Sequence, residues 1–518
     1  MFFMKKFVLS RKNVIFLLIL ILLVGTFLRF YNLGGNPFWF DETWSATSAR
    51  LDSTDKVLLL ALEYDEHPPL QHIIFYWWGK IAGYSEAALR SFSAILGVTS
   101  ILFVFLISKY LFGDKTALIS SFIFSLSAAY VEYSQEFRPY MLITFVTLAA
   151  LYFFIMALYE SKAIYWGIFT FFVVLGGNIE YLFSLFIFAI FIFLMFNLKH
   201  YKKSLKYIII SFLTIFLLLL PNLFLALFQT SNQVWSQLTL SPLWKILIIP
   251  LQFYSFIFGF HSPYLINYNL SINYLPLLII SLAFFTYFSI KGLISLNSER
   301  QKSYLLLCVL LVPIITLYII NLFTYIQMEP KRFLFIAFIF YIIIAKSIAS
   351  LKNKFLLASI TFILIISVIS LLGYYNFNKE NWPDIVKYIQ DNAQDGDFVG
   401  ISSSALAVSF NFYNNKPIDV YGIPGSYLEY HNDTFLAAFF GGRIERYNYG
   451  RVLITQDNFI QTLNKTIQNH SRMWFIQTRQ RNVDPKGYLL SYLNKNYQLM
   501  KSLNFSDGET KVYLYKLE

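Results

Sequence analysis

Long apolar runs alternate with short polar segments through the first 373 residues of the chain. An apolar run of about twenty residues is long enough to cross a bilayer as a helix. A shorter apolar stretch, 243–260, favours a re-entrant or interfacial helix. We therefore expect a mainly α, polytopic membrane protein. The pattern predicts about eleven transmembrane helices, near 14–28, 92–110, 116–131, 140–158, 163–178, 181–197, 208–228, 271–290, 304–323, 333–350 and 355–373.

The pattern changes after residue 373, where apolar runs shrink to strand length and alternate with amphipathic helices. Residues 382–402 predict a helix, a turn at Asp395-Gly396 and a strand. Two domains follow from this change: a transmembrane domain, 1–373, with interfacial helices in an external loop, 29–90, and a small α/β domain, 374–518. Further strands are predicted at 418–423, 452–455, 473–478 and 511–517, and helices near 457–470 and 487–497.

Composition excludes a soluble globular protein, because 57% of the 518 residues are hydrophobic and only 14% are charged. The net charge of +12 does not indicate nucleic acid, since Lys and Arg fall in small groups between the apolar runs. Under the positive-inside rule, these groups place the N-terminus in the cytoplasm and the C-terminal domain outside the cytoplasmic membrane. We expect the lipid bilayer as a partner and no nucleic acid.

The few charged side chains gather in segments on the predicted external side. Each has a structural explanation: a cap for a helix starting near Thr43 in the case of Asp41, an ion pair within its loop for Glu136, and headgroup contact for Lys331. These explanations leave open why acids and bases meet on one side. A carboxylate base that deprotonates an acceptor, beside cations that hold a phosphate leaving group, would use both. The residues are Asp41 and Glu42; an exposed His67 in HPPL; Glu136, Arg138 and Tyr140; and Lys331 and Arg332.

Four motifs occur in order: FWFDETW at 38–44, HPPL at 67–70, LRSFSAILG at 89–97 and YSQEFRPYMLI at 133–143. Together with PKRFLF at 330–335, they resemble the GT-C membrane glycosyltransferases. The resemblance is closest to the bacterial protein O-mannosyltransferase-like enzymes, which include aminoarabinose transferases. It implies an inverting hexosyl- or pentosyltransferase outside the cytoplasmic membrane. The implied donor is a polyprenyl-phosphate sugar, and the implied acceptor is a protein, lipid or glycan of the cell envelope.

The same resemblance implies roles for individual residues. Asp41 would be the catalytic base, supported by Glu42, and Glu136 would orient the acceptor or share a divalent cation, Mg²⁺ or Mn²⁺, with Asp41. Arg138, Lys331 and Arg332 would hold the donor phosphate, while His67 and Tyr140 would lie on the acceptor side. Whether a cation takes part stays open.

Two alternative functions also stay open, a transporter or flippase of lipid-linked sugars and a polymerase or ligase of lipid-linked glycans. A transporter is disfavoured, because the charges crowd one face and the chain shows no repeated halves.

Overall fold

The chain is described by a computed structural model that divides it into two units. Unit 1 comprises Met1–Leu33, Arg90–Phe224 and Thr239–Phe377; unit 2 comprises Gly34–Leu89, Leu225–Leu238 and Asn378–Glu518. The described residues are 10–65, 67–231, 242–260, 265–266, 269–270, 274–296, 300–323, 328–377, 379–403, 406–423, 454, 459–467, 470–505 and 510–517.

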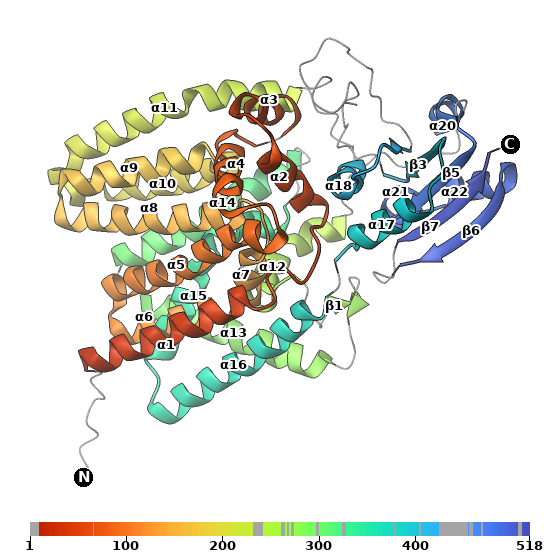
Figure 1. Ribbon diagram of the computed structural model, residues 1–518. Coiled ribbons are helices and arrows are strands. Elements are labelled where there is room, and N and C mark those ends of the chain that lie inside the picture. The colour runs from red at the N-terminus through yellow and green to blue at the C-terminus, as the bar shows by residue number, and fades with distance from the viewer. Residues whose placement is uncertain are drawn as a thin grey trace. The chain divides into compact units, whose positions relative to one another are not determined.

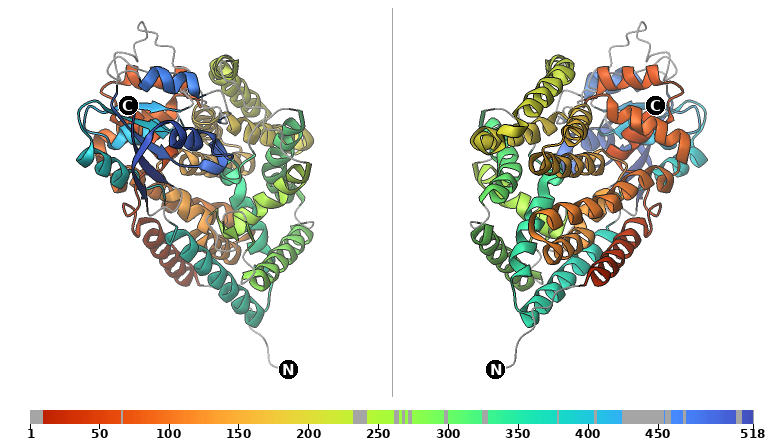
Figure 2. Two further views of the ribbon diagram at one scale, coloured as in Figure 1. Left: turned by 90° about the vertical axis from the view of Figure 1, so that its right-hand side faces the viewer. Right: turned by 90° about the vertical axis from the view of Figure 1, so that its left-hand side faces the viewer.

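Unit 1 is a bundle of helices, seen in Figures 1 and 2. A helix lies at each of the eleven positions predicted from the apolar runs, and a further one, α12, at the shorter stretch. The elements are α1 (Arg11–Phe30), α5 (Glu86–Phe112), α6 (Asp114–Leu126), α7 (Ala128–Ser134), α8 (Tyr140–Glu160), α9 (Ala163–Gly177), η1 (Tyr181–Phe183), α10 (Ser184–Asn197), η2 (Leu198–Ser204), α11 (Leu205–Ser231), α12 (Pro242–Phe258), β1 (Leu265–Ile266), β2 (Asn269–Leu270), α13 (Leu275–Leu296), α14 (Arg300–Phe323), η5 (Pro330–Phe333), α15 (Leu334–Ala349) and α16 (Asn353–Tyr375).

Eight helical stretches among the described residues are long and apolar enough to cross a membrane, or nine when α6 and α7 count as one bent span. The difference from eleven has local causes. Helix α9 has only 15 residues, and α10 and α11 belong to a single stretch, Tyr181–Leu227. Helix α12, which was not among the eleven predicted spans, has 17 residues and is also shorter than a span. The protein is a multi-pass membrane protein, as predicted.

Burial separates the lipid-facing helices from the centre of unit 1. Helix α1 exposes Phe16, Leu23 and Phe27, each more than 60% accessible. A face so apolar is suited to lipid rather than water. Helix α15 is buried on nearly every side and packs on α6, α8, α13 and α14. A helix that is apolar all round belongs in such a core.

A buried arginine fixes the 58° bend between α6 and α7. The last carbonyl groups of a helix have no partner within it. At the end of α6, the guanidinium of Arg29 supplies these partners, donating to the carbonyl oxygens of Ser125 at 3.0 Å and Phe124 at 3.3 Å. Ser127 then caps α7, because its hydroxyl accepts from the Tyr130 N–H. The break therefore comes from defined contacts at the end of α1.

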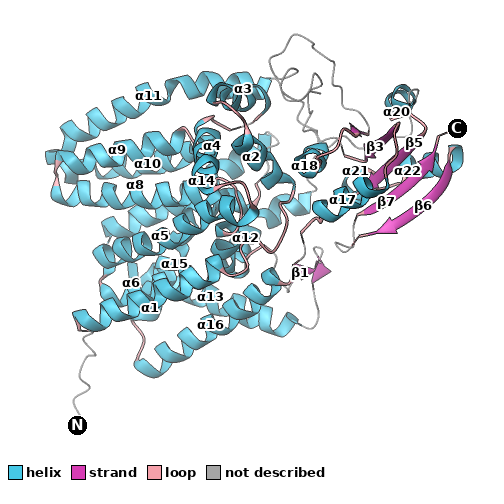
Figure 3. Cartoon of the chain, viewed as in Figure 1, coloured by secondary structure: helices cyan, strands magenta, loops and turns pink. Residues whose placement is uncertain are grey.

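Unit 2 ends in an α/β domain whose strands are magenta in Figure 3. The five strands adjoin in the order β4-β3-β5-β7-β6. Strand β3 is parallel to β4 and β5, and β7 is antiparallel to β5 and β6. The predicted α/β fold is confirmed, although most of the strand predicted at 452–455 lies outside the described residues. The elements are α17 (Trp382–Asn392), β3 (Asp397–Ile401), α18 (Ala407–Tyr413), β4 (Asp419–Gly422), α20 (Ile460–Ile467), β5 (Arg472–Gln477), α21 (Gln480–Val483), α22 (Tyr488–Asn496), β6 (Gln498–Asn504) and β7 (Lys511–Lys516).

Alternation along the strands gives this sheet two apolar faces. Val399 and Trp474 point to one face and pack with α17 and α18. Phe398 and Phe475, one position away on the same strands, point to the other face and pack with α20 and α22. The domain therefore has three layers, with the sheet between two layers of helices.

Three short helices of unit 2 precede the long α5: α2 (Phe40–Arg50), α3 (Thr54–Tyr64) and α4 (Leu70–Ala82). Their shared core contains Trp44, Leu60 and Tyr76, and Val408 of α18 completes it. Phe40, the first residue of α2, packs on the α17 face of the sheet. Helix α18 thus contributes to two cores of unit 2, that of the α/β domain and that of α2, α3 and α4.

Candidate active site

The acid pair lies in the first turn of α2. The helix begins at Phe40 with Trp39 as its N-cap, so Asp41 is inside the helix and does not cap one starting near Thr43. Free N–H groups and the positive end of the helix dipole favour carboxylates in a first turn. Asp41 is half-buried and Glu42 is completely buried.

Glu42 has a buried cation beside it. Lys379 Nζ lies 3.4 Å from Glu42 Oε2, and the two side chains are 5% and 0% exposed. A buried carboxylate is costly unless a positive charge compensates it. Lys379, which sequence reasoning missed, supplies that charge and leaves Asp41 as the more accessible acid of the pair.

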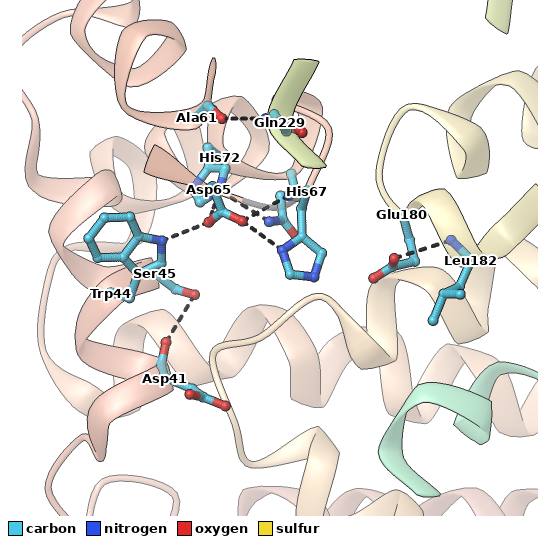
Figure 4. A network of polar contacts seen from close by, with 11 residues as sticks. Asp41, Trp44, Ser45, Ala61, Asp65, His67, His72, Glu180, Leu182 and Gln229 are labelled. Atoms are coloured by element: carbon cyan, nitrogen blue, oxygen red, sulfur yellow. Dashed lines mark hydrogen bonds and ion pairs between the residues drawn. The ribbon is translucent and has the colours of Figure 1, made fainter. Parts of the chain in front are cut away.

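Asp65 lies at the centre of a polar network, shown in Figure 4. Its Oδ1 accepts the backbone N–H of His67 at 3.0 Å and lies 2.6 Å from His67 Nδ1. Its Oδ2 accepts from Trp44 Nε1 at 2.7 Å and lies 2.9 Å from His72 Nε2. Four donors thus surround one buried carboxylate and hold the His67 ring in a single orientation. His67 is half-buried, so the prediction that it is exposed is wrong.

Charge as well as geometry distinguishes this carboxyl. Burial raises the pKa of Asp65, but the imidazoles of His67 and His72 outweigh burial and hold that pKa well below its usual range. Asp65 is therefore an anion at neutral pH. It can orient His67 without taking a proton from it.

In unit 1, Gln135 anchors the loop that carries Glu136 and Arg138. The Gln135 side-chain nitrogen donates to three carbonyl oxygens at the end of α1, those of Leu28, Arg29 and Tyr31, and Tyr374 of α16 donates to its amide oxygen at 3.0 Å. Helices α1 and α16 run side by side in Figure 2. The loop is therefore fixed to both helices, with Glu136 and Arg138 buried.

The segment that carries Lys331 meets this loop through an aromatic cluster. The Tyr140 ring packs edge-on against Tyr133, with the centroids 4.9 Å apart. Lys331 Nζ lies 5.9 Å from the centroid of Tyr140 and pairs with Glu329 at 2.8 Å. The carboxylate of Glu136 also acts electrostatically on the Tyr133 hydroxyl. Two of the predicted segments, YSQEFRPY and EPKRF, are thus brought together.

Comparison with known proteins gives partial matches in sequence. Residues 66–224 match the model of a family described as dolichyl-phosphate-mannose-protein mannosyltransferase. An uncharacterized protein of Aquifex aeolicus strain VF5 is 33% identical over 140 residues, which are 26% of this chain and 28% of that protein.

Matches in structure extend over nearly the whole chain. ArnT from Cupriavidus metallidurans in the apo state has a TM-score of 0.62 at 11% identity, with 98% of both chains covered. ArnT bound to undecaprenyl phosphate has a TM-score of 0.60. The Archaeoglobus fulgidus oligosaccharyltransferase, tethered to an acceptor peptide, has a TM-score of 0.58 at 14% identity, over 97% of this chain and 74% of its own. The chain therefore has the fold of ArnT and of this oligosaccharyltransferase, which is the GT-C fold expected from the sequence.

The predicted site residues fall into two groups. Unit 2 carries Asp41, Glu42 and His67, and unit 1 carries the remainder: Glu136, Arg138, Tyr140, Lys331 and Arg332. Sequence reasoning missed Asp65 and His72, although the spacing of Asp65 two residues before His67 was a signal. Nothing in the sequence pointed to Lys379, which is 337 residues from Glu42.

The resemblance to GT-C enzymes left a shared cation open. Within the described ranges, no three His, Cys, Asp or Glu side chains form a group that could hold a metal ion. Asp41 and Glu136, the pair considered for that cation, belong to different units. A divalent cation shared by Asp41 and Glu136 therefore stays a prediction of the sequence.

Proposed function

We propose that the chain is an inverting glycosyltransferase that moves a sugar from a polyprenyl-phosphate donor to an acceptor in the cell envelope, outside the cytoplasmic membrane. The GT-C fold and the undecaprenyl phosphate bound by ArnT support this class of donor. The observation that carries the proposal is Asp41, a half-buried carboxylate in a helix's first turn whose acidic neighbour is already compensated by Lys379.

Asp41 is the proposed general base. Its carboxylate takes the proton from an acceptor hydroxyl or amine, whose oxygen or nitrogen then attacks the anomeric carbon of the sugar. The bond between that carbon and the phosphate oxygen breaks, polyprenyl phosphate leaves with the bonding electrons, and the configuration inverts. Glu42 supports the first turn of α2 through Lys379, because its own charge is compensated. His67, oriented by Asp65, serves the acceptor side.

Unit 1 contributes the proposed phosphate-binding groups. Arg138 presents a guanidinium whose geometry suits two phosphate oxygens at once, and Lys331 and Arg332 add positive charge to stabilise the leaving group. Glu136 and Tyr140 orient the acceptor in this proposal. The Lys331 contacts with Tyr140 and Glu329 support its place in the group, since they hold a flexible side chain in one position.

The test is release of polyprenyl phosphate from a panel of radiolabelled polyprenyl-phosphate sugars, with cell-envelope acceptors and purified protein in detergent. Asp41→Asn is compared with Asp55→Asn, a change of an exposed acid in the first turn of α3. Since a positioned general base contributes about 10²–10⁴-fold, Asp41→Asn should lose turnover by that factor at unchanged thermal stability.

Other results of this assay would overturn the proposal or part of it. Turnover that survives in Asp41→Asn would remove Asp41 as the base and direct attention to Glu136. Consumption of oligosaccharide carriers alone would favour a polymerase or ligase. Movement of an intact lipid-linked sugar across vesicles, without release of polyprenyl phosphate, would replace the enzyme with a transporter. Chelation with EDTA and re-addition of Mg²⁺ or Mn²⁺ measures metal dependence.

A further inference from the structure

The C-terminal domain contacts α2 directly, within unit 2. Thr43 Oγ1 lies 2.9 Å from Ser409 Oγ of α18, and both side chains are completely buried. The Arg479 guanidinium lies 5.6 Å from the centroid of the Phe40 ring and pairs with Glu380 at 2.6 Å. These contacts join the acid-bearing turn of α2 to two separate segments of the domain.

Helix α18 also contacts residues at both ends of α2. The Tyr413 hydroxyl accepts the N–H of Phe38, two residues before α2, at 2.8 Å and donates to Glu86 at 3.0 Å. At the other end of α2, the Arg50 guanidinium stacks 3.6 Å from the centroid of Phe412 and donates to its carbonyl oxygen. A domain attached only through a linker would share no such contacts with α2.

Lys379 makes the most specific of these connections, because it reaches the acid pair itself. Its ammonium lies 3.4 Å from Glu42 Oε2. It also lies 6.0 Å from the ring centroid of Trp39, which is the N-cap residue of α2. Removing one partner of a buried ion pair is strongly destabilising, because the other charge loses that compensation. Lys379 therefore contributes to the stability of the first turn of α2, because it compensates the charge of the buried Glu42.

We infer that the C-terminal domain completes the part of the active site formed by the first turn of α2, and that Lys379 is a positioning residue for the acid pair, Asp41 and Glu42. This inference rests on the proposed function, in which Asp41 is the base. Lys379 neutralises Glu42 and fixes the first turn of α2, so that the Asp41 carboxylate points in one direction. Lys379 acts through Glu42 and touches neither donor nor acceptor in this scheme. The domain is thus a part of the enzyme rather than an independent binding module.

The test compares Lys379→Met and Lys379→Arg in the full-length protein with Lys387→Met, a change of an exposed lysine on α17. Thermal stability, kcat and the KM for a polyprenyl-phosphate sugar are measured for each. Lys379→Met should lower kcat at least tenfold with little change in KM, because donor binding does not use the first turn of α2. Lys379→Arg, which keeps the charge, should recover most of kcat, and Lys387→Met should match the wild type.

A double variant separates positioning from stability. Adding Glu42→Gln to Lys379→Met removes the stranded carboxylate, so the melting temperature should recover while kcat stays low. The inference is overturned if Lys379→Met lowers only the melting temperature and leaves kcat unchanged, or if Lys379→Arg rescues nothing. Failure of the proposed function would look different: the wild type would release no polyprenyl phosphate from any donor, while the stability of the single and double variants would still report the ion pair.

Discussion

Asp65 Oδ1 lies 2.6 Å from His67 Nδ1 and accepts the backbone N–H of the same residue. Two contacts to one oxygen fix both the ring of His67 and the chain that enters Pro68-Pro69. The second oxygen of Asp65 is held by Trp44 of α2 and faces His72 of α4. The carboxylate therefore connects the imidazole proposed for the acceptor side with the helix that carries the proposed base.

Replacing Asp65 with asparagine should release His67 from this orientation. An amide of the same shape cannot accept at both of its ends, so one of the contacts at His67 or His72 is lost. Because a small misplacement of a reacting group can cost about 100-fold in rate, we expect turnover of Asp65→Asn to fall by about 10- to 100-fold. Polyprenyl phosphate release measures it, with Asp52→Asn, an exposed acid, as the control.

A double variant tests whether this loss passes through His67. If Asp65 acts only by orienting that ring, Asp65→Asn combined with His67→Gln should be no slower than the slower single variant. Losses that simply multiply would show that the two residues act independently. Wild-type turnover in Asp65→Asn would contradict the orienting role outright.

Acid stability provides a second test of Asp65. Its pKa in the folded protein is well below the usual range, despite the opposing effect of burial, because of His67 and His72. A group with a lowered folded pKa stabilises the fold above its unfolded pKa, about 3.9 for aspartate, and loses that contribution as the pH falls through the folded value. The melting temperature of the wild type should therefore exceed that of Asp65→Asn at pH 6, and the difference should shrink below about pH 4. A constant difference down to pH 3 would contradict the ionic role.

Helices, strands and site residues could be predicted where a short stretch of sequence carries the signal. Run length alone locates the membrane helices, and short apolar runs locate β3 and β5. The acid pair and His67 were found because they sit in short motifs. The partners of these residues were not found, since Trp44 lies 21 residues from Asp65, and Lys379 lies 337 residues from Glu42. Such contacts depend on how α2 packs against α4 and the C-terminal domain, which no local pattern encodes.

The bend between α6 and α7 could not be predicted from the length of the apolar run. The run at 116–131 predicted one span, but the structure has two helices, α6 and α7, joined at Ser127. The break needs an arginine from α1 to satisfy the end of α6, and Arg29 appears in the sequence only as a basic residue after an apolar run. A third prediction follows from the space that this arginine requires.

Gly97→Ala should destabilise unit 1. A Cβ at Gly97 of α5 would collide with Ser134 Oγ and come within 2.8 Å of Arg29 Nε. Arg29 is fully buried and bonded to the end of α6, so it cannot move without losing those bonds. Overpacking of this kind costs about 1–3 kcal/mol, which should appear as a lower melting temperature in detergent. Gly167→Ala on α9, where an added Cβ meets nothing within 4 Å, is the matched control. Equal melting temperatures for the two variants would show that Arg29 does not need the glycine.

Tyr413→Phe should loosen the attachment of the C-terminal domain to the residues around α2. Burial, followed by the charge of Glu86, raises the pKa of the Tyr413 hydroxyl, so that group stays protonated and donates to Glu86 while accepting the N–H of Phe38. Losing a hydrogen-bond partner at a buried group costs about 1–3 kcal/mol.

Tyr388→Phe is the control for this change, because the Tyr388 hydroxyl is buried with no hydrogen-bond partner among the described residues. It should leave the melting temperature unchanged or raise it, whereas Tyr413→Phe should lower it and also lower kcat, since Phe38 leads directly into the turn that carries Asp41. If Tyr413→Phe lost stability while kcat remained at the wild-type value, the hydroxyl would support the fold of the domain alone. Loss of both quantities, absent in Tyr388→Phe, would show that catalysis depends on how α18 holds α2.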